Sequence, residues 1–417
     1  MNLQARRLLL LAPAFWPPHG AEALTGYKFW KAALANGWQV DVITRTATNL
    51  GRYPNQFNED TPEFTRSIHL ISPFSGLGDK FLANLFGLTT CQVLERGWAW
   101  TYLACRQADA LIQRHPYQAV ISRCLPIEGH LIGLWVKKRW GLPWIANWND
   151  PEPLEMRPRP YIGQSAEDIA WRKRLTLRQI ARYADWHTFP CERLRRFIAG
   201  YLPTDILGRS SVIPHVALSH WQRKMQPHDK LRLFHAGDIR PPRSGSTLLE
   251  GLARFINRCP AAGNDMEVVF AGPGSEAVVS TAQAYGTAGR VVRSLGLLSY
   301  QQMNEQSVCS DVGMVIEAPM AEGIFLPSKA IDLIQCGLPL LAIGPRVGTL
   351  PDLIASHGGG IAVDVTQPEE IAQALYHIWT LWKGGSLHNE LSPRPLLKLY
   401  GENAVMAQLE GVLKAIG

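Results

Sequence analysis

The sequence predicts an α/β protein with two doubly wound domains whose parallel sheets face each other across a cleft. Short apolar runs alternate with helical patterns along most of the 417 residues. The alternation stops at the polar, proline-containing segment 221–230 and then restarts. Successive parallel strands need long crossovers that are usually helices, so this alternation predicts two sheets, each covered on both faces. Ligands of such sheets bind at the carboxyl ends of the strands.

The first predicted domain spans residues 1–220. It begins with the apolar run 7–13, typical of a buried strand, followed by helical spacing over 21–37 that ends in a glycine. Its further strands are expected at 39–44, 67–72, 119–122, 143–147, 186–189 and 211–216. Its further helices are expected at 80–113, 128–139 and 166–183.

The second predicted domain spans residues 231–395 and follows a linker at 221–230. Its strands are expected at 231–236, 267–272, 290–294, 311–316, 339–344 and 361–365. Helical segments separate these strands, as parallel pairing requires. The C-terminal segment 396–417 reads as one more helix with regularly spaced apolar residues, and it could pack on either domain.

The charge is unevenly distributed between the two domains. Residues 1–220 carry 26 Lys and Arg against 17 Asp and Glu, whereas residues 221–417 carry 16 against 18. Basic clusters such as 171–182 and 192–197 have helical spacing, which fits a solvated helix face or attraction to anionic lipid headgroups. They lack the interleaved aromatic residues of a single-strand nucleic-acid groove, so we expect no nucleic-acid partner.

Cysteine usage points to a reducing compartment. The chain has seven cysteines and no C-x-x-C pair, which argues against a disulfide framework and a structural zinc site. Residues 6–23 imitate a signal peptide, but prolines interrupt them and the first strand is expected there. No apolar run reaches the length of a membrane span. We therefore expect a cytoplasmic protein.

The segment 322–342, EGIFLPSKAIDLIQCGLPLLA, carries the strongest chemical signal. A helix is expected to begin near Pro327 and end at Gly337, between two strands. The exposed N–H groups and positive dipole of a helix start suit a phosphate, and Lys329 adds a cation there. Asp332 lies three residues later on the same face and could accept hydrogen bonds from a sugar diol. Alternatively, Lys329 and Asp332 are an ordinary solvated pair.

A second candidate site follows the strand at 231–236. Gly237 ends the strand, and the loop after it carries Arg240 and Arg243, which could hold phosphate oxygens or form a solvated turn. Gly272 begins another glycine turn between a strand and a helix, which is weak evidence alone.

The first domain offers fewer candidates. Gly20 and Ala21 join the first strand to the first helix, and Gly20 would let a ligand approach the backbone. Asp150 follows the strand at 143–147 and should face the cleft, unless it only shapes the turn before a proline. Histidines 130, 187 and 215 are interpreted as structural. No G-x-G-x-x-G and no D-x-D occurs, so neither a dinucleotide nor a sugar-nucleotide metal site is indicated.

Together these motifs resemble the retaining glycosyltransferases of family four, also called glycosyl transferases group 1, which have the GT-B fold of two Rossmann-like domains. The segments 235–252, 292–303, 311–319 and 322–342 follow in the family order. In the first domain, PPHGAEAL with GWQVDVIT (17–24 and 37–44) resembles the first βαβ unit of the family.

The resemblance matches residues only in part. The family usually has two glutamates separated by seven residues, the second of which binds the ribose of the nucleotide. Asp332 matches the second acid, whereas Ile324 stands at the first position and Glu322 is the nearest acid. Asp238 stands where the family often has arginine, and Arg243 best matches its lysine.

The resemblance implies transfer of a sugar from a nucleoside-diphosphate donor to an acceptor hydroxyl, with retained configuration and without metal or cofactor. The implied catalytic side chains are Asp150, Arg243, Glu322 and Lys329. The implied donor-binding residues are Gly20, Ala21, Gly237, Arg240, Gly272, Gly323, Ile324, Phe325, Leu326, Pro327, Ser328 and Asp332.

The acceptor side is less defined. The acceptor would be a glycan, a glycolipid or another hydroxyl compound, as in the synthesis of cell-surface polysaccharides or glycolipids. The basic first domain and the apolar segment 76–88 could bring the protein to the inner face of an anionic membrane.

Two alternative functions remain: a nucleotide-sugar 2-epimerase and a sugar-nucleotide-binding protein without catalysis. A nicotinamide dehydrogenase is less favoured because the sequence lacks the G-x-G-x-x-G fingerprint of dinucleotide binding.

Overall fold

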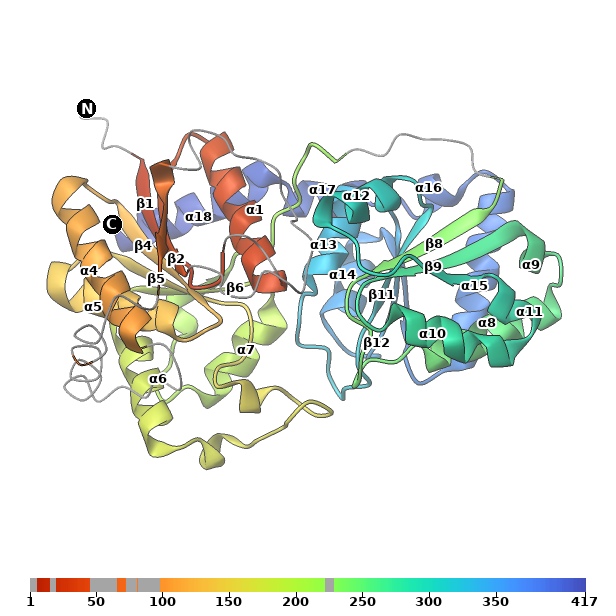
Figure 1. The fold of residues 1–417 in the computed structure, drawn as a ribbon, viewed down its shortest axis with the longest axis horizontal. Coiled ribbons are helices and arrows are strands. Elements are labelled where there is room, and N and C mark those ends of the chain that lie inside the picture. The colour runs from red at the N-terminus through yellow and green to blue at the C-terminus, as the bar shows by residue number, and fades with distance from the viewer. Residues whose placement is uncertain (1–5, 16–19, 46–65, 73–80, 82–97, 222–228) are drawn as a thin grey trace.

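The computed structural model contains two α/β domains placed side by side (Figure 1). It describes residues 6–15, 20–45, 66–72, 81, 98–221 and 229–417. Residues 16–19 within the signal-like start, the segment 76–88 except Phe81, and residues 222–228 of the linker lie outside these residues. None of the helices in the described part of the chain combines the length and apolar character that a membrane crossing requires.

The first domain has a seven-stranded sheet in the order β3-β2-β1-β4-β5-β6-β7, with every neighbouring pair parallel. The four leucines of β1, Leu8–Leu11, are fully buried because helices cover both faces of the sheet. The strands are β1 Arg7–Leu11, β2 Gln39–Arg45, β3 Ile68–Ile71, β4 Ala119–Cys124, β5 Trp144–Trp148, β6 Trp186–Phe189 and β7 Ser210–Val212. The longer helices are α1 Ala21–Ala35, α4 Trp98–Arg114, α5 Glu128–Trp140, α6 Trp171–Tyr183 and α7 Glu192–Tyr201.

The second domain has a six-stranded parallel sheet in the order β10-β9-β8-β11-β12-β13. Its apolar core lies between the sheet and helices such as α8 and α15, which pack against each other. The strands are β8 Leu231–Ala236, β9 Met266–Ala271, β10 Val292–Ser294, β11 Val312–Ile316, β12 Leu340–Gly344 and β13 Gly360–Asp364. The helices are α8 Ser246–Arg258, α9 Ala262–Asp265, α10 Ser275–Ala282, α11 Thr287–Arg290, α12 Tyr300–Val308, α13 Ser328–Gln335, α14 Thr349–His357, α15 Pro368–Lys383, α16 Leu387–Glu390 and α17 Arg394–Tyr400.

The C-terminal segment returns to the first domain. The predicted single helix is two helices, α17 and α18 (Glu402–Ile416), separated by Gly401, whose extended backbone forms a bridge with Ala217. α17 contacts α13 of the second domain, whereas α18 packs beside α1 (Figure 1). Apolar residues of α18, including Leu409, belong to the same buried cluster as Leu8 and Leu10 of β1. This chain path connects the two domains a second time.

Most predicted strands and helices are present, but some differ in extent. The strand expected at 211–216 ends at Val212, before Pro214, which has no N–H to continue a ladder. The helix expected at 166–183 is regular only from Trp171, after a short 3-10 turn. Within the region 80–113, the structure describes a helix only from Trp98. Helix α15 was not expected, although it begins with Pro368 and two glutamates.

Candidate functional site

A cleft between the two domains has a volume of about 430 Å³ and is lined by both of them. The loops that follow β1, β5, β8, β9 and β11 all reach it, as the carboxyl ends of parallel strands should. Twelve predicted site residues line this inter-domain cleft: Gly20, Ala21, Asp150, Gly237, Arg243, Gly272, Phe325, Leu326, Pro327, Ser328, Lys329 and Asp332.

Helix α13 directs its amino-terminal end at the cleft. Pro327, with φ of −62°, precedes the first helical residue, Ser328, and both line the cleft together with Lys329. No side chain of the described residues caps this helix end, so its first N–H groups are open to a ligand. The end of a helix in a cleft attracts an anion.

Two glycines keep the floor of the cleft accessible. Gly272 has φ of 114°, and a Cβ atom there would lie 2.6 Å from the carbonyl oxygen of Gly237. Gly237 has φ of 127°, and a Cβ atom there would contact Lys329 at 3.6 Å. A side chain at either position would be strained by the positive φ, and one at Gly272 would also push the β8 and β9 loops apart. Glycine is therefore needed where the two loops meet Lys329.

Lys329, Arg243 and Glu317 form the charged centre of the second domain. Burial and the positive charge of Arg243 lower the pKa of Lys329 to about 7. Burial raises the pKa of Glu317 to about 7, although Lys329 and Arg243 oppose this shift. Lys329 Nζ donates to the carbonyl oxygen of Ile316 at 3.4 Å. A bound anion would relieve the cost of holding two cations close together in a buried place.

The first domain contributes two partly buried acids, Glu22 and Asp150, to the cleft. Glu22 accepts from Arg123 Nε at 2.9 Å and from Asn149 Nδ2 at 2.7 Å, and burial raises its pKa. Asp150 lies 3.1 Å from Arg157, and burial raises its pKa as well. Both carboxyl groups are held by a neighbouring arginine, which fixes their orientation toward the cleft.

Asp332 lies one helical turn beyond Lys329 on α13. Its Oδ1 accepts a hydrogen bond from Tyr300 at 3.0 Å and forms an ion pair with Lys28 at 2.7 Å. Lys28 belongs to α1 of the other domain and is buried. The solvated pair of Lys329 with Asp332 that the sequence left open is therefore not what the structure shows.

Four predicted site residues do not line the cleft. Glu322 is half exposed and accepts from Arg193 of α7, on the far side of the loop. Its neighbour Gly323 bridges to Gly348, and Ile324 is buried with its carbonyl oxygen accepting from Cys191. Arg240 folds back onto Asp238. These contacts stabilise the loop and the domain contact instead of facing a ligand.

Sequence reasoning missed Glu317, Glu22, Lys28 and Tyr300. Glu317 follows β11 directly, and an acid at the carboxyl end of a parallel strand is the signal that could have identified it. Glu22 lies in the first turn of α1, directly after Gly20 and Ala21, so its position beside these candidates could have identified it. Lys28 gave no local signal, because its partner is 304 positions away.

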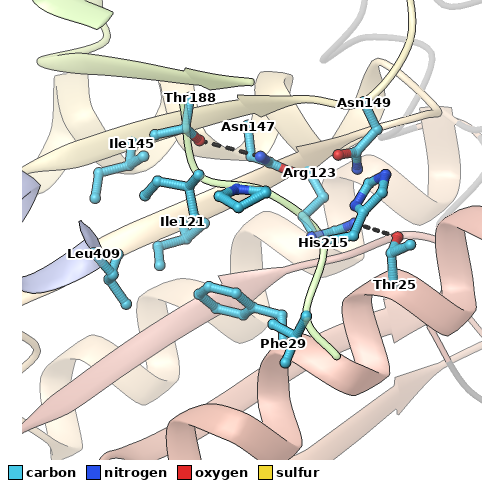
Figure 2. Close-up of a pocket in the computed structure, with 13 residues that line it drawn as sticks. Thr25, Phe29, Ile121, Arg123, Ile145, Asn147, Asn149, Thr188, His215 and Leu409 are labelled. Carbon is cyan, nitrogen blue, oxygen red and sulfur yellow. Dashed lines mark hydrogen bonds between the residues drawn. The ribbon is translucent and has the colours of Figure 1, made fainter. Parts of the chain in front are cut away.

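A small second cavity in the first domain shares Thr25, Asn149 and His215 with the lining of the cleft (Figure 2). Its volume of about 20 Å³ is close to the space that one water molecule needs. Asn147 donates to Thr188 there at 3.1 Å, and its Oδ1 has no partner among the described residues. His215 lines both this cavity and the cleft, and burial lowers its pKa to about 3. The cavity is too small for a substrate.

The other two histidines that the sequence analysis interpreted as structural lie in the core of the first domain. His130 and His187 are fully buried, and burial lowers the pKa of both. His130 Nδ1 is 2.8 Å from Ser122 Oγ, and Trp148 donates to His187 at 3.1 Å. Within the described residues, no group of three or more His, Cys, Asp or Glu is placed to hold a metal ion.

Comparison with solved structures decides the fold. Sucrose-phosphate synthase from Thermosynechococcus elongatus superposes with a TM-score of 0.66 and 14% identity, over 99% of this chain and 100% of that one. Anabaena HepE in complex with UDP and glucose superposes with a TM-score of 0.65 and 11% identity, over 98% and 99%. The chain has the GT-B fold.

A further GT-B match is a glycosyltransferase from Rickettsia africae, with a TM-score of 0.64 and 12% identity over 98% of both chains. No protein-family model matches the sequence, and a search of curated proteins returns no significant match. The expected fold of two parallel-sheet domains is thus confirmed, and the likeness extends over the whole chain.

Proposed function

We propose that this protein is a retaining glycosyltransferase that transfers a sugar from a nucleoside-diphosphate donor to an acceptor hydroxyl. The observation that carries this proposal is the placement of Arg243, Lys329 and the start of α13 together in the inter-domain cleft. These groups suit a diphosphate, and Asp332 on the same helix suits the adjoining ribose. HepE, which has the same fold, was solved with UDP and glucose.

In this proposal the leaving diphosphate is stabilised by the protein alone. The bond between sugar C1 and the β-phosphate oxygen breaks, and the phosphate keeps the electron pair. Lys329, Arg243 and the N–H groups of α13 neutralise the developing charge without reorganising, which lowers the barrier. The acceptor oxygen bonds to C1 on the face that the phosphate leaves, and its proton departs with the phosphate. Because these cations neutralise the diphosphate, we propose that the reaction needs no metal ion. Retention of the configuration at C1 is proposed on the basis of the family resemblance.

The acids of the cleft are assigned to the sugars. Glu317 is buried beside Lys329 and replaces Glu322 as our candidate for orienting the donor sugar. Asp150 and Glu22 lie on the first domain, where the acceptor would enter between the sheets. Carboxylates with fixed orientation can hold sugar hydroxyls by charge-assisted hydrogen bonds.

The experiment is a thermal-shift screen with UDP-, GDP-, ADP- and dTDP-sugars, because a bound donor raises the melting temperature. Asp332→Ala should then weaken binding of the stabilising donor by about 1–3 kcal/mol. A protein that no sugar nucleotide stabilises, in the presence or absence of Mg²⁺, would contradict the proposal. Formation of an epimer without acceptor would favour a nucleotide-sugar 2-epimerase, and binding without turnover a non-catalytic protein.

The acceptor class is proposed as a glycolipid or polysaccharide at an anionic membrane surface on the cytoplasmic side. On α6, Arg172, Arg174, Arg178 and Arg182 are all exposed, and Trp171 next to them is 69% exposed. Ile162 in the preceding loop is 60% exposed. Basic residues beside exposed apolar side chains favour anionic headgroups. The described cysteines are all free, which suits a reducing compartment.

Flotation with liposomes tests this part separately. Protein should float with phosphatidylserine-containing vesicles at low salt and remain in solution with phosphatidylcholine vesicles. Trp171→Ser combined with Arg174→Ser should abolish flotation while leaving the donor-induced thermal shift unchanged. Protein that stays in solution with both vesicles would reject the membrane surface without affecting the transferase proposal.

A further inference from the structure

Lys28 is a buried cation that reaches from one domain into the other. It lies on α1, its side chain is 2% exposed, and its Nζ is 2.7 Å from Asp332 Oδ1 on α13. A buried ammonium group is costly unless a carboxylate compensates it. The arrangement of the two domains therefore supplies the partner that Lys28 requires.

The two oxygens of Asp332 have different environments. Oδ1 receives both Lys28 and the hydroxyl of Tyr300. Oδ2 has no hydrogen-bond or ion-pair partner among the described residues, and Asp332 lines the cleft. One oxygen is thus fully engaged, whereas the other is available to a ligand.

Tyr300 is itself fixed by a chain of hydrogen bonds. Gln335 Nε2 donates to the Tyr300 hydroxyl at 2.8 Å and to Asn304 at 2.8 Å. The other end of the Gln335 amide accepts the N–H of Leu218, in the segment that leaves the first domain, at 3.1 Å. The orientation of Asp332 is therefore set from both domains, by Lys28 directly and by this chain.

We propose that Lys28 is a positioning residue of the donor site, which rests on the proposed function above. Lys28 engages Asp332 Oδ1 so that Oδ2 faces the ribose hydroxyls of the nucleotide. Since Lys28 belongs to the opposite domain, the ribose is recognised fully only when the domains are together. Nucleoside recognition and domain closure are thereby linked through one ion pair.

The experiment measures the affinities of UDP and 2′-deoxy-UDP by calorimetry for wild type and Lys28→Met. Wild type should bind UDP more tightly than the deoxy analogue, by roughly tenfold for a lost hydrogen bond to a charged group. In Lys28→Met, UDP affinity should fall by roughly tenfold and the ratio should approach one. Lys28→Arg keeps the charge and should restore much of the ratio. The donor KM should rise in Lys28→Met while kcat changes less.

Arg193→Met is the matched control. Arg193 also pairs with the second domain, at Glu322 and Asp352, but does not touch Asp332. If loss of any domain contact were sufficient, this variant would lower the ratio as well, which would overturn the proposal. With Asp332→Asn in place, Lys28→Met should cause no further fall in the ratio.

The outcomes separate the two proposals. Wild type that binds none of UDP, GDP, ADP and dTDP would reject the proposed function. Wild type that binds UDP, together with a Lys28→Met variant that keeps the wild-type ratio, would reject only the role of Lys28. If Lys28→Met does not fold, as judged by circular dichroism, Lys28→Arg and Lys28→Gln provide the same comparison of ratios.

Discussion

Arg193 of the first domain donates to Glu322 of the second domain, outside the inter-domain cleft. The same guanidinium donates to Asp352 at 2.7 Å, so Glu322 belongs to a contact between domains. Glu317, five residues earlier, is buried in the cleft beside Lys329. Of these two acids, Glu317 is therefore the one that lines the cleft, although the family resemblance pointed to Glu322.

Exchanging the two acids for amides should separate their roles. Glu317→Gln should lower kcat by about tenfold or more, since a charged hydrogen bond in a buried site contributes about 1.5–3 kcal/mol. Glu322→Gln should change kcat by less than about threefold, because exposed ion pairs contribute about 0–1 kcal/mol. Steady-state kinetics with the identified donor measures both. Equal losses in the two variants would contradict this assignment.

Arg243 should act on the diphosphate and not on the nucleoside. Arg243→Ala should weaken UDP binding by about tenfold or more, as expected for a lost charge-assisted contact, and leave UMP binding nearly unchanged. Competition experiments with the two nucleotides measure this difference. Arg240→Ala is a suitable control, because Arg240 pairs with Asp238 and does not line the cleft. Parallel losses for UMP and UDP would place Arg243 elsewhere.

The sequence predicted those features that depend on neighbouring residues. Strands such as β1 and β12 contain continuous apolar runs, and their burial on both faces explains why they are recognisable. Lys329 and Asp332 are three residues apart on one helix, so their placement on one face required no tertiary information. Both line the cleft, as their spacing predicted.

The features that could not be predicted depend on how distant segments meet. Lys28 is indistinguishable from a solvated lysine until α1 is placed against α13. Gly401 looks like an interior residue of one apolar helix, yet its pairing with Ala217 divides that helix in two. Arg193 and Glu322 likewise meet only through the arrangement of the domains. Local patterns predict helices and strands, but not these contacts.

The stability of the nucleotide-free protein should depend on pH through Glu317 and Lys329. The pKa of Glu317 is raised to about 7, so the folded state binds more protons than the unfolded state between about pH 4.5 and 7. Its contribution to the free energy of unfolding therefore falls as the pH rises through this range. The pKa of Lys329 is lowered to about 7 from 10.5, so its contribution rises again between about pH 7 and 10.5.

Two variants separate the contributions of Lys329 and Glu317 to the free energy of unfolding. Lys329→Met should be more stable than wild type near pH 7 to 8, and this advantage should shrink toward pH 10. Glu317→Gln should reach its full advantage over wild type at about pH 7 and above, and lose it toward pH 5. Thermal melts across this pH range, without nucleotide, measure both trends. Differences that do not vary with pH would show that neither group has a shifted pKa.

Nucleotide binding should reverse the shift at Lys329. A diphosphate next to the ammonium group favours its charged form, so UDP binding at pH 8 should be accompanied by proton uptake. Calorimetry in buffers with different ionisation enthalpies measures the number of protons taken up. UDP affinity should fall as the pH rises above 7, and the fall should be weaker in Lys329→Arg, whose guanidinium stays charged. Proton release on binding, or an affinity independent of pH, would contradict this prediction.

The close approach of the β8 and β9 loops should make Gly272 sensitive to substitution. A Cβ atom at Gly272 would lie 2.6 Å from a backbone oxygen of Gly237, at a φ of 114° that other residues rarely adopt. Gly272→Ala should lower the free energy of unfolding by about 2 kcal/mol or more, combining strain with displacement of the loop. Gly385→Ala is the control, since its φ is 68° but no atom lies within 4 Å of the added methyl group. Because the displaced loop lines the cleft, Gly272→Ala should also weaken UDP binding, whereas Gly385→Ala should leave it unchanged. Chemical denaturation and calorimetry of the two variants measure these effects, and similar behaviour of both would indicate that the loops can move apart without cost.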